Sequence, residues 1–251
     1  MIRFAGFGHS HIVALAQGCY DLAGRGERFG DQAFEGHFHY LYGETLTPPI
    51  IEGKLNPNII EKISEAGAQF IMLSLGGNEH SALSVVQRQE RFDFILGEAP
   101  DLPLDPDATI LPEAVIRETL RETMEEVSAT LRAFRDTVSL PIIHIEPPPP
   151  LPRERVLDHP GEFFHTVIDS TRVSSNCLRY KMWRTQAKLY REICERLDVF
   201  YAPIPKDFFA EDGTLAPFAW GKDATHANPQ FGEHMILDAL SLLATRLQPG
   251  G

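Results

Sequence analysis

Short apolar runs alternate along the chain with longer segments whose apolar residues recur at helical spacing. Runs of this length, bounded by turn residues, predict strands. The predicted strands are Ile2 to Phe7, Phe38 to Tyr42, Gln69 to Leu75, Pro141 to Ile145 and Val199 to Ala202. Strands that alternate with helices are typical of a parallel sheet with helices on both faces. The pattern therefore predicts a doubly wound α/β sheet of about five parallel strands.

Helices are predicted where an apolar stripe follows a start signal. The clearest stripe lies within Pro112 to Val138 and predicts one long helix. Asn56-Pro57 and Asn228-Pro229 each combine an N-cap residue with a proline at the first helical position, which predicts that helices begin there. A further helix is predicted from about Cys177 to Leu197.

Two proline-rich stretches, Gly97 to Leu111 and Glu146 to Ser175, interrupt this alternation. Both are predicted to be loops. Long connections inside a compact domain are often functional, so these loops are candidates for walls or lids over a site. The alternative is that they are solvated spacers without a role.

Composition restricts the possible classes of protein. A chain of 251 residues, 43% hydrophobic, is long enough for one large core, and we expect a single domain over residues 1–251. No run of about 18 apolar residues that could span a membrane occurs. The net charge of -12 disfavours nucleic acid as a partner. Three cysteines without CxxC spacing, and a start at Met1 without a leader pattern, fit a reducing cytoplasmic location.

A polar segment follows the first, the third and the fifth predicted strand. The last of these segments also lies just before the final helix. These segments are Gly8-His9-Ser10-His11, Gly76-Gly77-Asn78-Glu79-His80 and Asp223-Ala224-Thr225-His226. In an open parallel sheet, ligands bind beyond the carboxyl ends of the strands. The three segments are therefore expected to converge on one edge of the sheet.

The residue types in these segments fit nucleophilic catalysis. A serine hydroxyl becomes nucleophilic when an imidazole takes its proton, and a carboxylate must orient that imidazole. Ser10, His226 and Asp223 can fill these three roles. The spacing of Asp223 and His226 in a turn before a helix can bring the carboxylate to Nδ1 while Nε2 faces Ser10.

Attack on an ester also creates an oxyanion, which needs hydrogen-bond donors placed in advance. The side-chain amide of Asn78 is one candidate, and the backbone amide of Ser10 at a helix N-terminus is a second. A third is a glycine in the loop after the second strand, Gly53 or, less favoured, Gly43.

In their order and position, Gly8-His9-Ser10, Gly77-Asn78 and Asp223 to His226 resemble blocks I, III and V of the SGNH (GDSL-type) hydrolases. The resemblance covers nearly the whole chain. It implies a flavodoxin-like sheet and an esterase, lipase, thioesterase or carbohydrate deacetylase that needs no metal or other cofactor. The implied partner is a small-molecule ester or an acylated carbohydrate. His9, His11 and Glu79 depart from the residues usual in that family.

Each of these residues also has a plain structural interpretation. A serine between a strand and a helix is often an N-cap, an asparagine after a strand is often a turn residue, and Asp-x-x-His before a helix is often surface capping. Only their joint placement favours catalysis. A non-catalytic binding protein on the same fold therefore remains an alternative.

A metal-dependent phosphoesterase is a second alternative. Gly76 to His80 and Gly8 to His11 are similar to the GNH[DE] and GHxH motifs of calcineurin-like metallophosphoesterases, but the order of the residues and of the motifs does not fit. His37 and His39, at alternate positions of a strand, could share a face and bind a metal.

Aromatic residues divide into core and pocket candidates. Trp183 and Tyr190, spaced along a predicted helix, are expected in the core. Phe163, Phe164, Phe218 and Trp220 lie in predicted loops and are candidates to line a pocket.

Overall fold

The computed structural model describes residues 1–86, 90–166 and 172–247, and its central feature is one parallel sheet of five strands. The strand order is β2-β1-β5-β8-β9. These strands are β1 (Ile2–Gly8), β2 (Phe34–Tyr40), β5 (Phe70–Ser74), β8 (Ile142–Ile145) and β9 (Phe200–Ala202). The predicted α/β sheet is confirmed, and four of the five strands lie within two residues of the predicted bounds.

Side chains of the central strands point alternately to the two faces of the sheet, and each face carries its own hydrophobic core. Phe4 on β1 and Met72 on β5 belong to the core beneath α1 and α9. Phe7 and Leu73 belong to the opposite core beneath α2, α4 and α5. Because both faces are covered, the strands are apolar on both sides, as buried parallel strands usually are.

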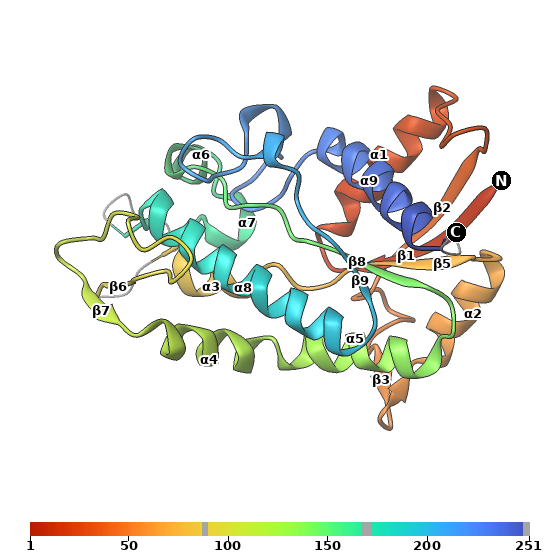
Figure 1. The fold of residues 1–251 in the computed structure, drawn as a ribbon, viewed down its shortest axis with the longest axis horizontal. Coiled ribbons are helices and arrows are strands. Elements are labelled where there is room, and N and C mark those ends of the chain that lie inside the picture. Colours follow the sequence, from red (N-terminus) through yellow and green to blue (C-terminus); the bar gives the residue numbers. More distant parts are fainter. Residues whose placement is uncertain (87–89, 167–171, 248–251) are drawn as a thin grey trace.

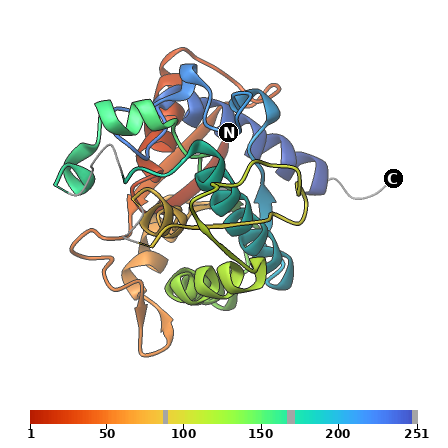
Figure 2. The same cartoon turned by 90° about the vertical axis from the view of Figure 1, so that its left-hand side faces the viewer.

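Helices of two layers enclose the sheet, as Figure 1 and the end-on view of Figure 2 show. The long helices are α1 (Ile12–Gly24), α2 (Pro57–Glu65), α4 (Glu113–Thr123), α5 (Glu125–Thr137), α8 (Asn176–Arg196) and α9 (Pro229–Leu247). The short ones are α3 (Glu79–Ser84), α6 (Arg153–Asp158), α7 (Gly161–Phe164) and the 3-10 turns Lys206–Phe208 and Pro217–Ala219. Within the described residues, no helix has the length and apolar character needed to cross a membrane.

Two predicted elements differ from the structure. The long helix divides at Met124, where φ and ψ are -90° and 5°. The Thr123 hydroxyl donates to the Leu120 carbonyl at 2.8 Å, a local bond that competes with regular helix. The second strand begins at Phe34 rather than Phe38 and contains Gly36. A Cβ at Gly36 would lie 2.6 Å from the rings of both Phe4 and Phe38, so the packing of these rings requires a glycine inside the strand.

The two predicted loops contain more regular structure than expected. Thr109–Leu111 forms β7, which pairs in parallel with β6 (Phe92–Phe94). A buried ion pair between Lys181 and Asp93 at 2.5 Å fastens this pair of strands to α8. The second loop contains α6 and α7, and its residues 167–171 lie outside the described residues. A separate hairpin consists of β3 (Ile50–Ile51) and β4 (Lys54–Leu55).

Close packing of α1 against α9 brings two distant segments together. A Cβ at Gly18 would lie 2.3 Å from the Glu233 nitrogen, and a Cβ at Gly232 would lie 1.9 Å from the Ala14 oxygen. Only glycine allows the two backbones to approach this closely. The N-terminal ends of α1 and α9, which follow Ser10 and His226, consequently lie beside each other.

Candidate active site

Ser10 lies in the turn that joins β1 to α1. Gly8 ends the strand, and a Cβ there would lie 2.4 Å from the Ser74 carbonyl oxygen of β5, so the turn requires glycine at this point. The carbonyl oxygens of His9 and Ser10 accept from the amides of Ile12 and Val13 and start the helix. Among the described residues, the Ser10 amide has no hydrogen-bond acceptor, which leaves it free to bind one.

Asp223 and His226 form a fixed pair in the turn before α9. Nδ1 of His226 lies 2.7 Å from Oδ2 of Asp223, and Oδ1 accepts from the amides of Thr225 and His226 at 3.0 Å each. Burial raises the pKa of Asp223, but these hydrogen bonds outweigh burial and hold the pKa below its usual range. A carboxylate accepts the proton on Nδ1, so Nε2 of the neutral ring carries the lone pair. Nε2 is buried and has no hydrogen-bond partner among the described residues.

Asn78 lies at the start of α3, on a loop that several side chains hold in place. Oε2 of Glu79 accepts from the Gly77 amide at 2.8 Å and from Nε2 of Gln186 at 2.5 Å. Oε1 of Gln186 accepts from the amide of His80 at 2.8 Å. Glu79, which differs from the residue usual in the SGNH family at this position, therefore supports the backbone on both sides of Asn78.

His9 also supports this loop. Its Nδ1 accepts from the Gly76 amide at 2.9 Å, and its ring stacks on Tyr42 at 4.6 Å. Burial lowers the pKa of His9 to about 4, so the ring is neutral at pH 7. His9 thus links the end of β1 to the loop that carries Asn78.

His11 packs directly against His226, with 4.9 Å between the ring centroids. Both nitrogens of His11 are buried without a partner among the described residues. Burial, and to a lesser extent the neighbouring His226, lowers the pKa of His11 to about 3. The ring is therefore neutral at pH 7 and leaves the charge of the site unchanged.

Ser10, Asn78, Asp223 and His226 line one cavity of about 270 Å³. Pro160, Gly161 and Phe164 from the loop around α7 also line it, so this loop is a wall of the cavity. Figure 1 shows α3, α6 and α7 at the end of the sheet opposite the chain's N-terminus. No hydrogen bond joins the Ser10 hydroxyl to Nε2 of His226 in the described chain, and in unliganded enzymes such bonds are often long.

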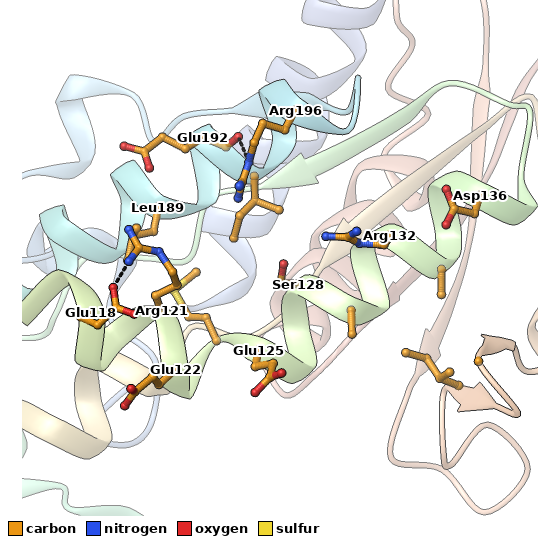
Figure 3. A pocket seen from close by; sticks show the side chains of 16 residues that line it. Glu118, Arg121, Glu122, Glu125, Ser128, Arg132, Asp136, Leu189, Glu192 and Arg196 are labelled. Carbon is orange, nitrogen blue, oxygen red and sulfur yellow. Dashed lines mark hydrogen bonds and ion pairs between the residues drawn. The ribbon is translucent and has the colours of Figure 1, made fainter.

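Gly53 lies away from this cavity, so its predicted place in the oxyanion hole is wrong. It occupies the turn of the β3-β4 hairpin with φ of +75° and lines a separate groove of about 690 Å³ beside α4, α5 and α8. Figure 3 shows that groove, whose labelled side chains are mostly charged and partly paired, as in Arg121 with Glu118. Gly43 does not replace it, because its amide already donates to the Tyr40 carbonyl at 3.0 Å.

The aromatic residues predicted to line a pocket lie in different parts of the structure. Phe164 lines the small cavity and Trp220 a larger one beside it. Phe218 packs against Phe208, and the side chain of Phe163 lies outside the described residues. Trp183 and Tyr190 are buried in the core, as predicted.

The two histidines considered for a metal share one face of β2, as predicted, but each has a different neighbour. His37 lies 3.5 Å from Glu35, whereas His39 stacks on Phe7. In the described ranges, no group of three or more His, Cys, Asp and Glu side chains is arranged to hold a metal ion.

Comparison with solved structures finds proteins of similar architecture at low sequence identity. A gut microbial diltiazem-metabolizing enzyme superposes with a TM-score of 0.50 at 11% identity over 98% of this chain, which spans 47% of that enzyme. An acetyl xylan esterase from Geobacillus stearothermophilus has a TM-score of 0.48 at 14% identity, covering 98% and 96% of the two chains. A GDSL-like lipase from Bacteroides thetaiotaomicron has a TM-score of 0.40 at 11% identity, covering 97% and 87%. No family model and no curated protein matches the sequence.

The strand order β2-β1-β5-β8-β9 is that of a flavodoxin-like doubly wound sheet. The chain has the SGNH hydrolase fold.

Within the SGNH fold, Gln186 supports the loop that carries Asn78 and was not predicted from the sequence. Gln186 lies between Met182 and Tyr190 on the buried stripe of α8, and it is itself 1% exposed. A polar residue on an apolar stripe is the signal that could have found it, because a buried amide needs partners.

Proposed function

We propose that this protein hydrolyses carboxylic esters by acyl transfer through Ser10. The observation that carries the proposal is that Ser10, Asn78, Asp223 and His226 line one cavity, with Asp223 bonded to Nδ1 of His226 and Nε2 left without a partner. This is the set of roles that serine hydrolases need.

In the first step, Nε2 of His226 takes the Ser10 hydroxyl proton while Oγ attacks the ester carbonyl carbon. The carbonyl oxygen becomes an oxyanion, which the Asn78 amide and the Ser10 backbone amide stabilise. The tetrahedral intermediate collapses, His226 gives its proton to the departing alcohol, and an acyl-Ser10 ester remains. Asp223 orients the ring and stabilises its charged form.

In the second step, a water molecule gives a proton to His226 and attacks the acyl-Ser10 carbonyl. The resulting intermediate expels the Ser10 oxygen, which recovers its proton from His226, and the carboxylic acid leaves. The helix N-terminus at Ser10 favours the developing negative charge in both steps. The balance of the reaction requires only ester and water.

Two substitutions test the proposal on a short aryl ester such as phenyl acetate. Ser10→Ala and His226→Ala are each expected to abolish hydrolysis while the circular dichroism spectrum and Tm stay close to those of the wild type. Wild-type activity in either variant would sink this mechanism. An inactive but correctly folded wild type across a panel of aryl esters would favour a binding protein on the same fold.

A further inference from the structure

A second and larger cavity adjoins the candidate active site. Its volume is about 760 Å³, and it shares Ser10, Asp223 and His226 with the smaller cavity, whereas Asn78 lines only the smaller one. A molecule in this cavity would therefore lie against the hydroxyl and the imidazole. Its remaining walls come from α1, α6, the segment around Trp220 and the start of α9.

Arg155 on α6 places a positive charge in the wall of this cavity. One of its terminal nitrogens, Nη2, donates to the Gly221 carbonyl at 2.7 Å, and the guanidinium carbon lies 6.0 Å from the centre of a Trp220 ring. These contacts fix the orientation of the side chain. Its Nε is buried without a hydrogen-bond partner, and within the described ranges no carboxylate forms an ion pair with Arg155.

A half-buried guanidinium without a carboxylate partner is costly, because desolvation of the charge is not offset by a nearby anion. Arg25 and Arg184 avoid that cost by pairing with Glu233 and Glu98. The buried Arg179 has no ion pair in the described chain, but it donates to the Leu151 carbonyl and to Oδ1 of Asn176. Arg155 differs from them in lining a cavity. An anionic group bound in that cavity would supply the missing partner.

The rest of the lining also favours a negatively charged ligand. Lys222 is exposed at the cavity and has no ion pair within the described part of the chain. Among the described residues that line the cavity, Asp223 is the one carboxylate, and it already has hydrogen bonds with His226 and Thr225. Asn228 and Pro229 place the N-terminal end of α9 at the cavity, where a helix dipole favours negative charge. This local positive site stands out in a chain of net charge -12.

We propose that the larger cavity binds a carboxylate group of the substrate, with Arg155 as its principal partner and Lys222 as a second cation. This inference rests on the proposed ester hydrolysis and adds to it a substrate class, esters that carry a free carboxylate. Trp220 offers an apolar surface for the part of the molecule between the carboxylate and the ester.

Matched substrates that differ only in charge test the subsite. On the alcohol side, 4-acetoxybenzoate is compared with 4-acetoxybenzamide, and on the acyl side phenyl hydrogen adipate with phenyl adipamate. For the anionic member of at least one pair, Arg155→Gln is expected to reduce kcat/KM by about 10- to 100-fold, mainly through KM, because a hydrogen bond to a charged group is lost. The neutral member should change less than about twofold.

Control variants separate charge from packing. Arg155→Lys keeps a cation and should retain part of the preference for the anion, and Lys222→Gln should weaken it by a smaller factor, about three- to tenfold, because an exposed charge is screened. Lys54→Gln removes an exposed cation on the β4 strand and should leave the preference unchanged. Equal effects of Arg155→Gln on charged and neutral esters would overturn the proposal.

Binding of a non-reactive probe distinguishes failure of the subsite from failure of the proposed reaction. Calorimetric titration with 4-hydroxybenzoate and adipate, each compared with its amide, is expected to show binding of at least one anion by the wild type that Arg155→Gln weakens at least tenfold. Arg155-dependent binding without ester hydrolysis would retain the anion site and reject the reaction. Hydrolysis without any Arg155-dependent preference or binding would reject the anion site and retain the reaction.

Discussion

Nδ1 of His226 lies 2.7 Å from Oδ2 of Asp223, and this one contact determines which ring nitrogen can accept a proton. Because the carboxylate accepts the Nδ1 proton, the lone pair is left on Nε2. The hydrogen bonds that lower the pKa of Asp223 keep its carboxylate charged at pH 7. The pair is thus ready to take a proton from a hydroxyl on the Nε2 side.

Asp223→Asn should keep the shape of this pair but remove its preference for one tautomer. The asparagine amide can face Nδ1 with its NH₂ group, which places the lone pair on Nδ1 and the proton on Nε2. We expect kcat to fall by about 10⁴-fold, as in other serine triads with this change. Steady-state kinetics on an aryl ester, with Tm as the control for folding, measure it. A loss below tenfold would mean that Asp223 does not orient the base.

Asn78→Ala should reduce kcat by about 10²- to 10³-fold with little change in KM, because the amide bonds the oxyanion only as charge develops. Asn78 is exposed, so Tm should stay within about 2 °C of the wild type. The matched control is Gly53→Asn, since asparagine tolerates the positive φ of this turn. That variant should keep wild-type activity. Wild-type kcat in a folded Asn78→Ala variant would contradict the place of Asn78 in the oxyanion hole.

Glu79 should act as a positioning residue for Asn78. Glu79→Ala removes the acceptor for the Gly77 amide and for Gln186, which loosens the loop and should reduce kcat by about 10- to 100-fold. Glu79→Gln keeps one oxygen that can accept from the Gly77 amide, so it should recover most of kcat. Equal kcat values in the two variants, at equal Tm, would contradict a positioning role.

Four buried histidines should make the folded state sensitive to acid. Burial lowers the pKa values of His9, His80 and His144 to about 4 and that of His11 to about 3. In the unfolded chain each titrates near 6.5, so below that pH the unfolded state binds more protons than the folded state and stability falls. The loss for each residue ends near its folded pKa.

Between pH 6 and 4 the free energy of unfolding should therefore fall by up to about 5 kcal/mol for each pH unit when all four contribute. Urea denaturation at pH 7.5, 6 and 5 measures this slope. The His144→Phe variant, which preserves stacking on Tyr190, should have a shallower slope than the wild type. His37→Gln, a control at a partly exposed position of β2, should match the wild type. A free energy of unfolding that is constant down to pH 5 would refute this account.

Local rules predicted most of the sheet and the convergence of the polar segments, because apolar runs and N-cap prolines report directly on strands and helix starts. They failed at Gly36, whose place in β2 depends on the rings of Phe4 and Phe38 above it. They failed also at Gly53, which was chosen only because it lies in the loop after the second strand. In the structure, Gly53 is in the turn of the β3-β4 hairpin and does not line the cavity. Arg155 gave no sequence signal, since its isolation from carboxylates is a property of the folded chain.

The His9 and His11 departures could be noticed in the sequence but not interpreted there. In the structure, His9 accepts from the Gly76 amide, and His11 is a neutral ring packed on His226. Both roles depend on burial, which a sequence pattern does not measure. The two imidazoles beside Ser10 therefore add support and packing to the site without adding charge at pH 7.

Covalent labelling of Ser10 tests the central claim most directly. A fluorophosphonate probe reacts much faster with a serine that a neighbouring base activates than with other residues, and mass spectrometry of the digested protein identifies the modified residue. The account predicts one adduct on Ser10 in the wild type, none in Ser10→Ala, and at least a hundredfold slower labelling in His226→Ala. An unlabelled Ser10 in a wild-type protein that hydrolyses aryl esters, or an adduct on another residue, would contradict it.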